Sequence, residues 1–275
     1  MAPRLFFLVA LCCLARISAV FAGAWTQAPG AYYLKIAAHH LHTRDHFDAS
    51  GIRVPKLGRG ELTDLGLQAY AEYGLRERLT LVAALPYKHL EDQRRFSSGT
   101  GREQSRGFGD LELGMRWRLS ARPLVSAIAV GGTIPLGYAV DAGTRVPLGT
   151  GEFSGDIRLL LGRSLHPVPG YLTGELGYRV RGGAYSDEFF YLIEAGFAQR
   201  RWGLKGYVSG LRTRGACGGL GQEGLIGDQD VLKIAPGLSY RLSPRLELAM
   251  DLIHVAAGCN TVAGNTLATG VVFKR

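Results

Sequence analysis

The chain has no apolar run long enough for a membrane-spanning helix. Its N-terminal apolar run, Leu5–Ala15, is about eleven residues long and ends before Arg16, whereas a spanning helix needs about 20 apolar residues. A transmembrane helix is therefore excluded. The remaining way to cross a bilayer is a closed β-barrel, in which every backbone polar group is paired between strands.

The N-terminal run instead has the features of a secretory signal peptide. Arg4 supplies the positive start, and residues 20–22 form a small-residue cleavage signal. Cleavage after Ala22 divides the chain into a signal peptide at 1–22 and one mature domain at 23–275, with cleavage after Ala24 as the alternative. Both interpretations predict that the protein is exported.

Cysteine is scarce, at four residues in 275. Cys12 and Cys13 lie in the predicted signal peptide, which leaves Cys217 and Cys259 as an even pair in an oxidising compartment. Both fall in predicted loops on the same side of the fold. We treat them as a candidate disulfide, with two separate free thiols as the alternative.

Motifs for catalysis and cofactor binding are also missing. The stretch 215–224 is rich in glycine but has no Lys-Ser/Thr pair of a phosphate-binding loop. His40 and His42 share a strand face, yet no Cys or carboxylate is spaced with them as a metal ligand. His254 could act as a base only with Ser209, which lies on a predicted strand two strands away, and no hydrolase motif surrounds them. We predict no catalytic residue, no metal site and no cofactor.

A plug domain is excluded as well, because only residues 23–30 precede the first predicted strand. This length rules out a plugged, energised receptor.

What the chain does contain is a pattern repeated about every twenty residues. An alternating apolar and polar stretch ends in an aromatic residue, a tight turn rich in Arg, Ser and Pro follows, and alternation resumes. Clear examples are 73–79, 117–123 and 240–246. Such alternation is typical of strands with one face toward lipid and the other toward water.

We predict twelve strands, an even number with lengths near those of bacterial single-chain barrels. They lie at 31–42, 61–73, 79–88, 107–119, 124–137, 152–165, 171–181, 187–198, 202–213, 230–242, 245–257 and 265–273. The strands beside Gly183 and the last hairpin leave ten or fourteen strands as alternatives. Residues 91–106 are expected to form a long loop. The predicted fold is all-β, a closed antiparallel transmembrane β-barrel of about 12 strands after a cleaved signal peptide.

Aromatic residues mark the short-turn ends of the predicted strands. These are Tyr73, Trp117, Phe197, Trp202, Tyr240 and Phe273. Amphipathic rings prefer the level of the lipid headgroups, so this placement indicates a membrane girdle. A soluble sandwich would scatter its core aromatics instead. Glycine, at 39 residues, suits the curved and crowded positions of a barrel wall.

The formal charge is +9, and loss of Arg4 and Arg16 with the signal peptide leaves +7. An exported barrel does not meet nucleic acid, so the excess of positive charge must have a different binding partner. Arginines gather in a predicted loop, at positions 94, 95, 102 and 106. We expect them to contact phosphates of outer-membrane lipid, including lipopolysaccharide; a solvated rim is the alternative.

The inward faces of the predicted strands carry charges of both signs. The candidate lumen network comprises Asp64, Glu72, Asp110, Glu112, Arg116, Asp156, Arg158, Glu175, Arg179, Glu194, Lys233 and Asp251. Further inward charges include Lys35, Arg118, Glu188, Lys205, Arg241 and Glu247. Because unpaired charge in a low-dielectric wall is costly, opposite signs should pair across strands. The network is interpreted as structural, as a constricted pore that selects a solute, or as both.

Several segments resemble the outer-membrane proteins of the MetA-pathway phenol-degradation family. They are 23–27, 73–81 with 85–87, 107–114 with 117–119, 147–151 and 161–165. The resemblance covers most of the mature chain. It implies a channel-like role for small, aromatic molecules in the outer membrane of a Gram-negative bacterium, with no catalytic residues. Barrel-assembly machinery is the expected partner, and barrels commonly end on an aromatic residue. This chain departs from that pattern, because Lys274 and Arg275 follow the final aromatic residue, Phe273.

The sequence thus favours a passive channel for small, aromatic or hydrophobic molecules, whose solute it does not specify. Two alternatives are a lipid-active barrel enzyme and a structural or adhesive surface barrel without transport.

Overall fold

The computed structural model describes residues 23–96, 99–138, 146–217 and 227–275. The predicted signal peptide at 1–22 lies outside the described residues. None of the described helices has the length and apolarity to cross a membrane.

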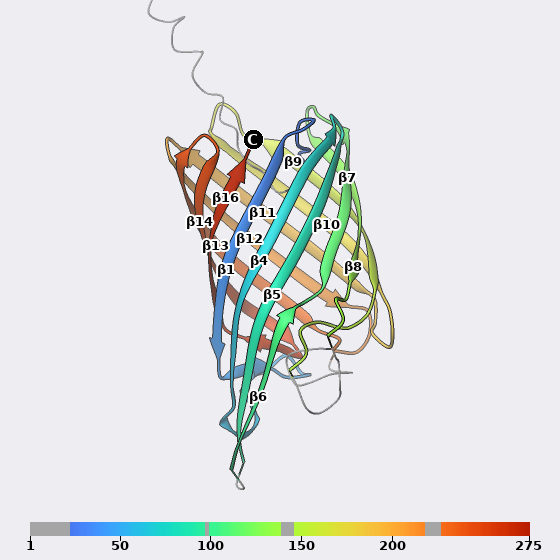
Figure 1. Cartoon of the computed structure of the whole chain (residues 1–275). Helices are drawn as coiled ribbons and strands as arrows, with labels where there is room; N and C mark the ends of the chain where they lie inside the picture. The colour runs from blue at the N-terminus through green and yellow to red at the C-terminus, as the bar shows by residue number, and fades with distance from the viewer. Residues whose placement is uncertain (1–22, 97–98, 139–145, 218–226) are drawn as a thin grey trace, which may run out of the picture.

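Twelve antiparallel strands close into a barrel, as predicted (Figure 1). They are β1 (Tyr32–Thr43), β4 (Glu61–Arg76), β5 (Leu79–Phe96), β7 (Leu111–Ser120), β8 (Val125–Ile134), β9 (Ser154–Ser164), β10 (Gly170–Arg181), β11 (Glu188–Gln199), β12 (Trp202–Thr213), β13 (Asp230–Ser243), β14 (Leu246–Cys259) and β16 (Asn265–Lys274). Each barrel strand pairs with the strands before and after it, and β16 closes the ring on β1. Closure leaves no strand edge to be exposed to lipid.

The two ends of the barrel differ. The inner end carries the short turns and the C-terminus, and the outer end carries the longer connections (Figure 1). At the outer end, β2 (Asp45–Phe47), β3 (Arg53–Pro55) and β15 (Thr261–Ala263) form a separate three-stranded sheet, followed along the chain from β3 by the short 3₁₀ helix η1 (Leu57–Arg59). Phe47 of this small sheet packs with Val231 and Val255 of the barrel wall. The outer end is therefore partly covered on the side of β13 and β14.

The expectation of a loop at residues 91–106 is wrong. Strand β5 continues past the barrel and pairs with β6 (Gly99–Phe108), so that the segment projects as a β-hairpin. The strand expected at 107–119 accordingly starts at Leu111. Polar composition suggested a loop, but cross-strand ion pairs such as Arg102 Nη2 to Glu91 Oε2, at 2.6 Å, stabilise the hairpin. Hydrogen bonds from Arg102 and Gln93 lower the pKa of the Glu91 carboxyl to about 2, so it is ionised near neutral pH.

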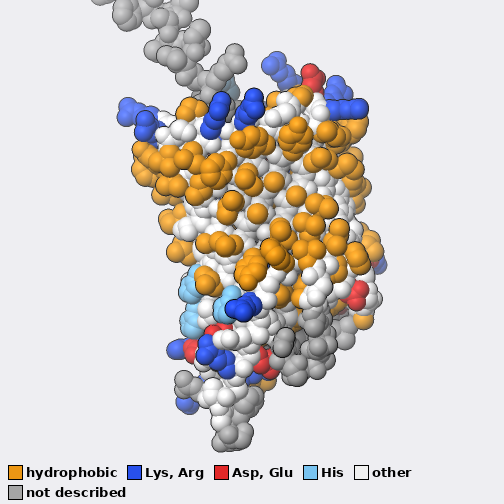
Figure 2. Space-filling view, in the orientation of Figure 1, with side chains coloured by type: hydrophobic (Ala, Val, Ile, Leu, Met, Phe, Trp, Pro, Cys, Tyr) orange, Lys and Arg blue, Asp and Glu red, His pale blue; other side chains and the backbone are white. Residues whose placement is uncertain are grey.

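Strand β7 illustrates why these residues form a barrel wall. Leu113, Met115 and Trp117 point outward and are 45%, 48% and 52% exposed, whereas Arg116 between them is 5% exposed. Side chains on a strand alternate between its two faces, so the apolar set covers the outside and the charged set lines the inside. Figure 2 shows the resulting hydrophobic belt between two charged ends.

The aromatic girdle lies where the sequence predicted it. Tyr73, Trp117, Phe197, Trp202 and Phe273 are exposed at the inner ends of their strands. Tyr240 stands beside Trp202 with ring centroids 4.7 Å apart. The level of these rings marks the inner border of the hydrophobic belt.

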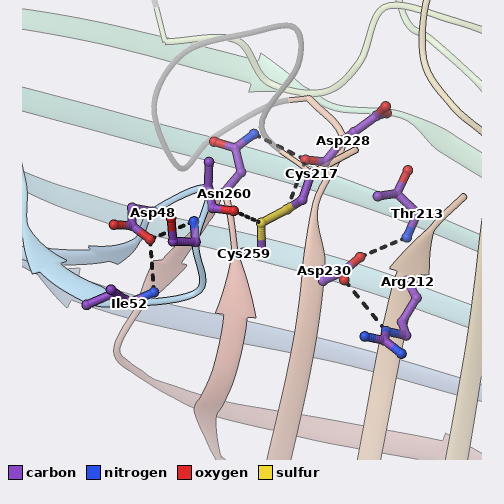
Figure 3. Close-up of a disulfide and its surroundings, with 11 residues drawn as sticks. Asp48, Ile52, Arg212, Thr213, Cys217, Asp228, Asp230, Cys259 and Asn260 are labelled. Carbon is purple, nitrogen blue, oxygen red and sulfur yellow. Dashed lines mark hydrogen bonds and ion pairs between the residues drawn. A yellow bond between two sulfur atoms is a disulfide. The ribbon is translucent and has the colours of Figure 1, made fainter. Parts of the chain in front are cut away.

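The two remaining cysteines meet at the outer end. Cys217 and Cys259 form a disulfide that joins the segment after β12 to the end of β14 (Figure 3). Around it, the Asn260 backbone donates to the Asp48 carbonyl at 3.1 Å, and the Asn260 side chain donates to the Asp228 carbonyl at 3.2 Å. The disulfide and the Asn260 hydrogen bonds together join three connections of the outer end.

We expect the denatured protein to migrate faster on a gel without reductant than with it. The covalent link closes a loop with a sequence separation of 42 residues, which makes the unfolded chain more compact. The variant Cys217→Ser should migrate identically in both lanes. Equal mobility of the wild type with and without reductant would remove the disulfide.

Candidate functional site in the barrel lumen

Eleven of the twelve residues of the candidate lumen network lie in barrel strands, and Asp110 lies just before β7. Strand alternation places the eleven strand residues opposite the lipid-facing ones, at positions 64, 72, 112, 116, 156, 158, 175, 179, 194, 233 and 251. Ten of the twelve make an ion pair or a hydrogen bond with another side chain. Glu112 and Lys233 have no ion pair within the described ranges.

Some pairs join two members of the predicted network. Arg116 Nη2 lies 3.1 Å from Glu72 Oε1, and both side chains are almost fully buried. Arg158 bridges Asp156, at 2.5 Å, and Glu175, at 3.2 Å. The Arg116–Glu72 and Arg158–Glu175 contacts join different strands, as expected for buried charges in the wall, whereas Asp156 and Arg158 lie on the same strand, β9.

Other network members pair with residues outside the set. Arg179 contacts Glu188, and Asp64 contacts His39 Nε2 at 3.1 Å. Asp110 accepts a hydrogen bond from the Tyr138 hydroxyl. Sequence spacing could not reveal these partners, because each depends on which strands become neighbours or on how a loop folds back.

Two lysines share one carboxylate on the opposite side of the lumen. Lys35 Nζ lies 2.8 Å from Asp251 Oδ2, and Lys205 Nζ lies 3.0 Å from Asp251 Oδ1. The lysines lie on β1 and β12, and each side chain extends across one intervening strand to reach Asp251 on β14. Gly237 makes room for this contact, because a Cβ there would meet both Asp251 and Lys205. The three charges sum to +1.

Aromatic rings also line the lumen, which the sequence analysis missed. Tyr33 and Tyr70 stand edge to face with centroids 6.0 Å apart, and the Tyr171 hydroxyl donates to Glu194 at 2.5 Å. The guanidinium groups of Arg158 and Arg179 lie 5.1 and 5.2 Å from the centroid of Phe190. The signal was present in the alternation, which places these rings on the same strand faces as the charges.

The segment before β1 enters the inner end of the lumen. Ala24 is fully buried and packs against Val125, Ala127 and Leu160, all on the inner faces of β8 and β9. The Trp25 ring stands edge-on to Tyr171 at 6.2 Å. These contacts show that residues 23–27 fill part of the lumen.

Hydrogen bonds hold this segment against the charged wall. Gln27 donates from its backbone to Thr80 Oγ1 at 2.8 Å and from its side chain to Glu72 at 2.7 Å. Arg116 donates to the Trp25 carbonyl at 2.9 Å. The Glu72–Arg116 pair therefore has a second role, since it anchors the N-terminal segment.

A second segment narrows the lumen near the outer end. Val146 and Leu148, which follow the undescribed residues 139–145, are buried against Leu90 on the inner face of β5. Lys88 Nζ donates to the Leu148 carbonyl at 2.8 Å. Residues 23–27 thus narrow the inner end of the lumen and residues 146–148 narrow its outer end, and both segments contact β5.

Metal-binding and hydrolytic arrangements find no support among the described residues. No group of three or more His, Cys, Asp or Glu side chains there could hold a metal ion. His254 is exposed and contacts Asn265 Oδ1 at 2.7 Å, whereas alternation places Ser209 on the inner face of β12. These two residues therefore do not form a nucleophile and base pair.

Comparisons with known proteins show the fold. No protein-family profile and no curated protein matches the sequence. An outer-membrane channel from Pseudomonas putida F1 is similar in structure, with 17% identity, a TM-score of 0.70, and coverage of 93% of this chain and 100% of that one. The NanC porin follows at 9% identity and a TM-score of 0.51, covering 88% and 100%.

The translocator domain of the autotransporter NalP from Neisseria meningitidis is also similar, with 12% identity and a TM-score of 0.50 over 90% of this chain and 89% of that domain. At these identities the likeness identifies the architecture of an outer-membrane β-barrel.

Proposed function

We propose that this protein is a passive outer-membrane channel for small molecules. The observation that carries the proposal is a wet interior behind an apolar exterior. Gln68 and Glu112 occupy inward positions on β4 and β7, yet both side chains are exposed. Exposure on an inward face requires solvent space within the barrel, which a closed structural wall would not need.

The finer proposal is that small aromatic or hydrophobic molecules are the solutes. Its support is the set of rings that face the lumen beside the charges, namely Tyr33, Tyr70, Tyr171, Phe190 and Tyr207. Aromatic rings offer flat apolar contact with a polar edge. The similar P. putida protein is described as an outer-membrane channel, which is consistent with the proposed channel and names no solute.

An enzymatic role is the rival proposal, and the separation of His254 from Ser209 argues against it. Outer-membrane lipid, including lipopolysaccharide, and barrel-assembly machinery are the proposed partners. Of the arginines expected to contact lipid phosphates, Arg94 and Arg102 are already ion-paired with Asp92 and Glu91. Lipid contact would therefore compete with pairs inside the outer hairpin.

Purified protein should raise the conductance of a planar lipid bilayer in discrete, small steps. Small steps are expected because residues 23–27 and 146–148 both occupy lumen space. The control is protein denatured in detergent, which should leave the bilayer silent. Silence of the folded protein across salt concentrations and voltages would contradict a channel and favour a structural barrel.

A further inference from the structure

The positive charge of the protein is concentrated at the inner end of the barrel. We define the inner rim as the five short turns after β4, β7, β9, β11 and β13, the three strand residues on each side of every turn, and the two residues after Phe273. Its eleven bases are Arg76, Arg78, Arg118, Arg122, Arg163, Arg200, Arg201, Arg241, Arg245, Lys274 and Arg275. Its two acids are Glu77 and Glu247, so its formal charge is +9. The mature chain outside the rim has 19 bases and 21 acids, a formal charge of −2.

This charge is hardly compensated within the protein. Of the eleven bases, only Lys274 has an ion pair among the residues described, with Glu247 at 2.9 Å. The lumen differs, because Arg116 and Arg158 each contact a carboxylate. Eight of the rim arginines are exposed, at positions 76, 78, 122, 163, 200, 201, 245 and 275. On the face drawn in Figure 2, basic side chains gather at this end of the hydrophobic belt.

The rim lies at the depth of the lipid headgroups. Trp202 and Tyr240 of the aromatic girdle are paired in register on β12 and β13. Arg201 directly precedes Trp202, Arg241 directly follows Tyr240, and the Arg241 backbone N–H donates to the Arg201 carbonyl at 2.8 Å. Girdle rings settle at the headgroup level, and one strand residue spans about 3.3 Å. The two arginines therefore stand within a few ångströms of that level.

Four of the rim bases meet at one open pocket of about 360 Å³. They come from the β11–β12 turn, the end of β13 and the end of β16. The lining residues are Arg200, Arg201, Arg241, Leu242, Ser243, Pro244 and Lys274, and no carboxylate is among them. Guanidinium groups present paired donors that match the oxygens of a phosphate. The pocket therefore fits a phosphate group better than a neutral or cationic ligand.

We propose that the inner rim binds anionic phospholipids of the inner leaflet of the outer membrane, with one lipid phosphate in the pocket. Bases occur in all five short turns and after Phe273, so the charge surrounds the barrel as lipid does. A single protein partner would need charge on one side only. Clustered lysines and arginines beside a membrane attract anionic lipid. The inference depends on the placement of the barrel in a membrane and not on conduction.

The test measures lipid binding to the folded mature protein in neutral detergent by native mass spectrometry. The probes are phosphatidylglycerol and phosphatidylcholine of equal chain length. The wild type should bind phosphatidylglycerol several-fold more tightly, because the choline cation is repelled by the rim. The triple variant Arg200→Gln/Arg201→Gln/Arg241→Gln should bind phosphatidylglycerol several-fold more weakly and phosphatidylcholine as before.

The matched control is Arg53→Gln/Arg212→Gln/Arg214→Gln. It removes the same charge from the outer end, where each of the three arginines already contacts a carboxylate. This variant should keep the wild-type preference for phosphatidylglycerol. Heat-modifiable migration on gels confirms that each variant is folded before it is measured.

The outcomes separate the lipid from other sources of phosphate and from the channel. Equal binding of the two lipids by the wild type would overturn the proposal, and so would equal losses in the two triple variants. Displacement of phosphatidylglycerol by an equal concentration of inorganic phosphate would assign the pocket to a soluble ion instead of a lipid. Because binding is measured without conduction, failure here leaves the proposed channel standing, and a silent bilayer leaves the lipid site standing.

Discussion

Deletion of residues 24–28 should raise the single-channel conductance several-fold. These residues fill the inner end of the lumen, where Ala24 packs on Leu160 and the Gln27 side chain donates to Glu72. Conductance of a narrow pore rises steeply as its smallest cross-section grows. The measurement is the amplitude of current steps in planar bilayers at fixed salt and voltage.

The deletion should not unfold the barrel, because it removes no strand residue. Arg116 keeps Glu72 as its partner at 3.1 Å after Trp25 and Gln27 are gone. Gly23 remains next to Ala22, so the predicted signal cleavage site is unchanged. A matched control replaces 24–28 with a Gly-Ser segment of equal length, which should give an intermediate conductance. Steps of wild-type size in the deletion variant would show that the segment does not limit flow.

The substitution Leu113→Arg should destabilise the barrel in lipid by roughly 2–4 kcal/mol, as arginine does near the middle of a bilayer. Leu113 is 45% exposed on the outer face and pairs in register with Ala83. It lies four residues from Trp117, which marks the inner border of the belt. The measurement is the free energy of unfolding by guanidinium in lipid vesicles.

The neighbouring substitution Glu112→Gln is the control for this prediction. Glu112 faces the lumen and has no ion pair among the residues described, so its neutralisation should change the unfolding free energy by less than about 0.5 kcal/mol. It should alter conduction instead. Equal destabilisation by the two variants would contradict the facing of β7.

The strands were predictable because, within each one, apolar residues that face lipid alternate with polar residues that face the lumen. In β7, Leu113, Met115 and Trp117 alternate with Glu112 and Arg116, and this local pattern needs no knowledge of the rest of the chain. The same rule located the charged inner faces, including Asp251 and Lys35. It failed at residues 91–106, because a hairpin outside the membrane has no apolar face and its polar residues resemble those of a loop.

The partners within the lumen were not predictable in the same way. Asp251 pairs with Lys35, which is 216 residues away along the chain, and with Lys205. The pair with Lys35 depends on ring closure between β1 and β16, which brings the two ends of the chain together. Short-range spacing holds no information about this contact.

The sequence by itself determined the twelve-strand barrel, its two faces and its girdle, because alternation is a local response of each strand to lipid and water. Only the tertiary structure decided what fills the barrel. Residues 23–27 have no periodic pattern, and their position follows from contacts with Glu72, Arg116 and Leu160, which meet only when the ring is closed.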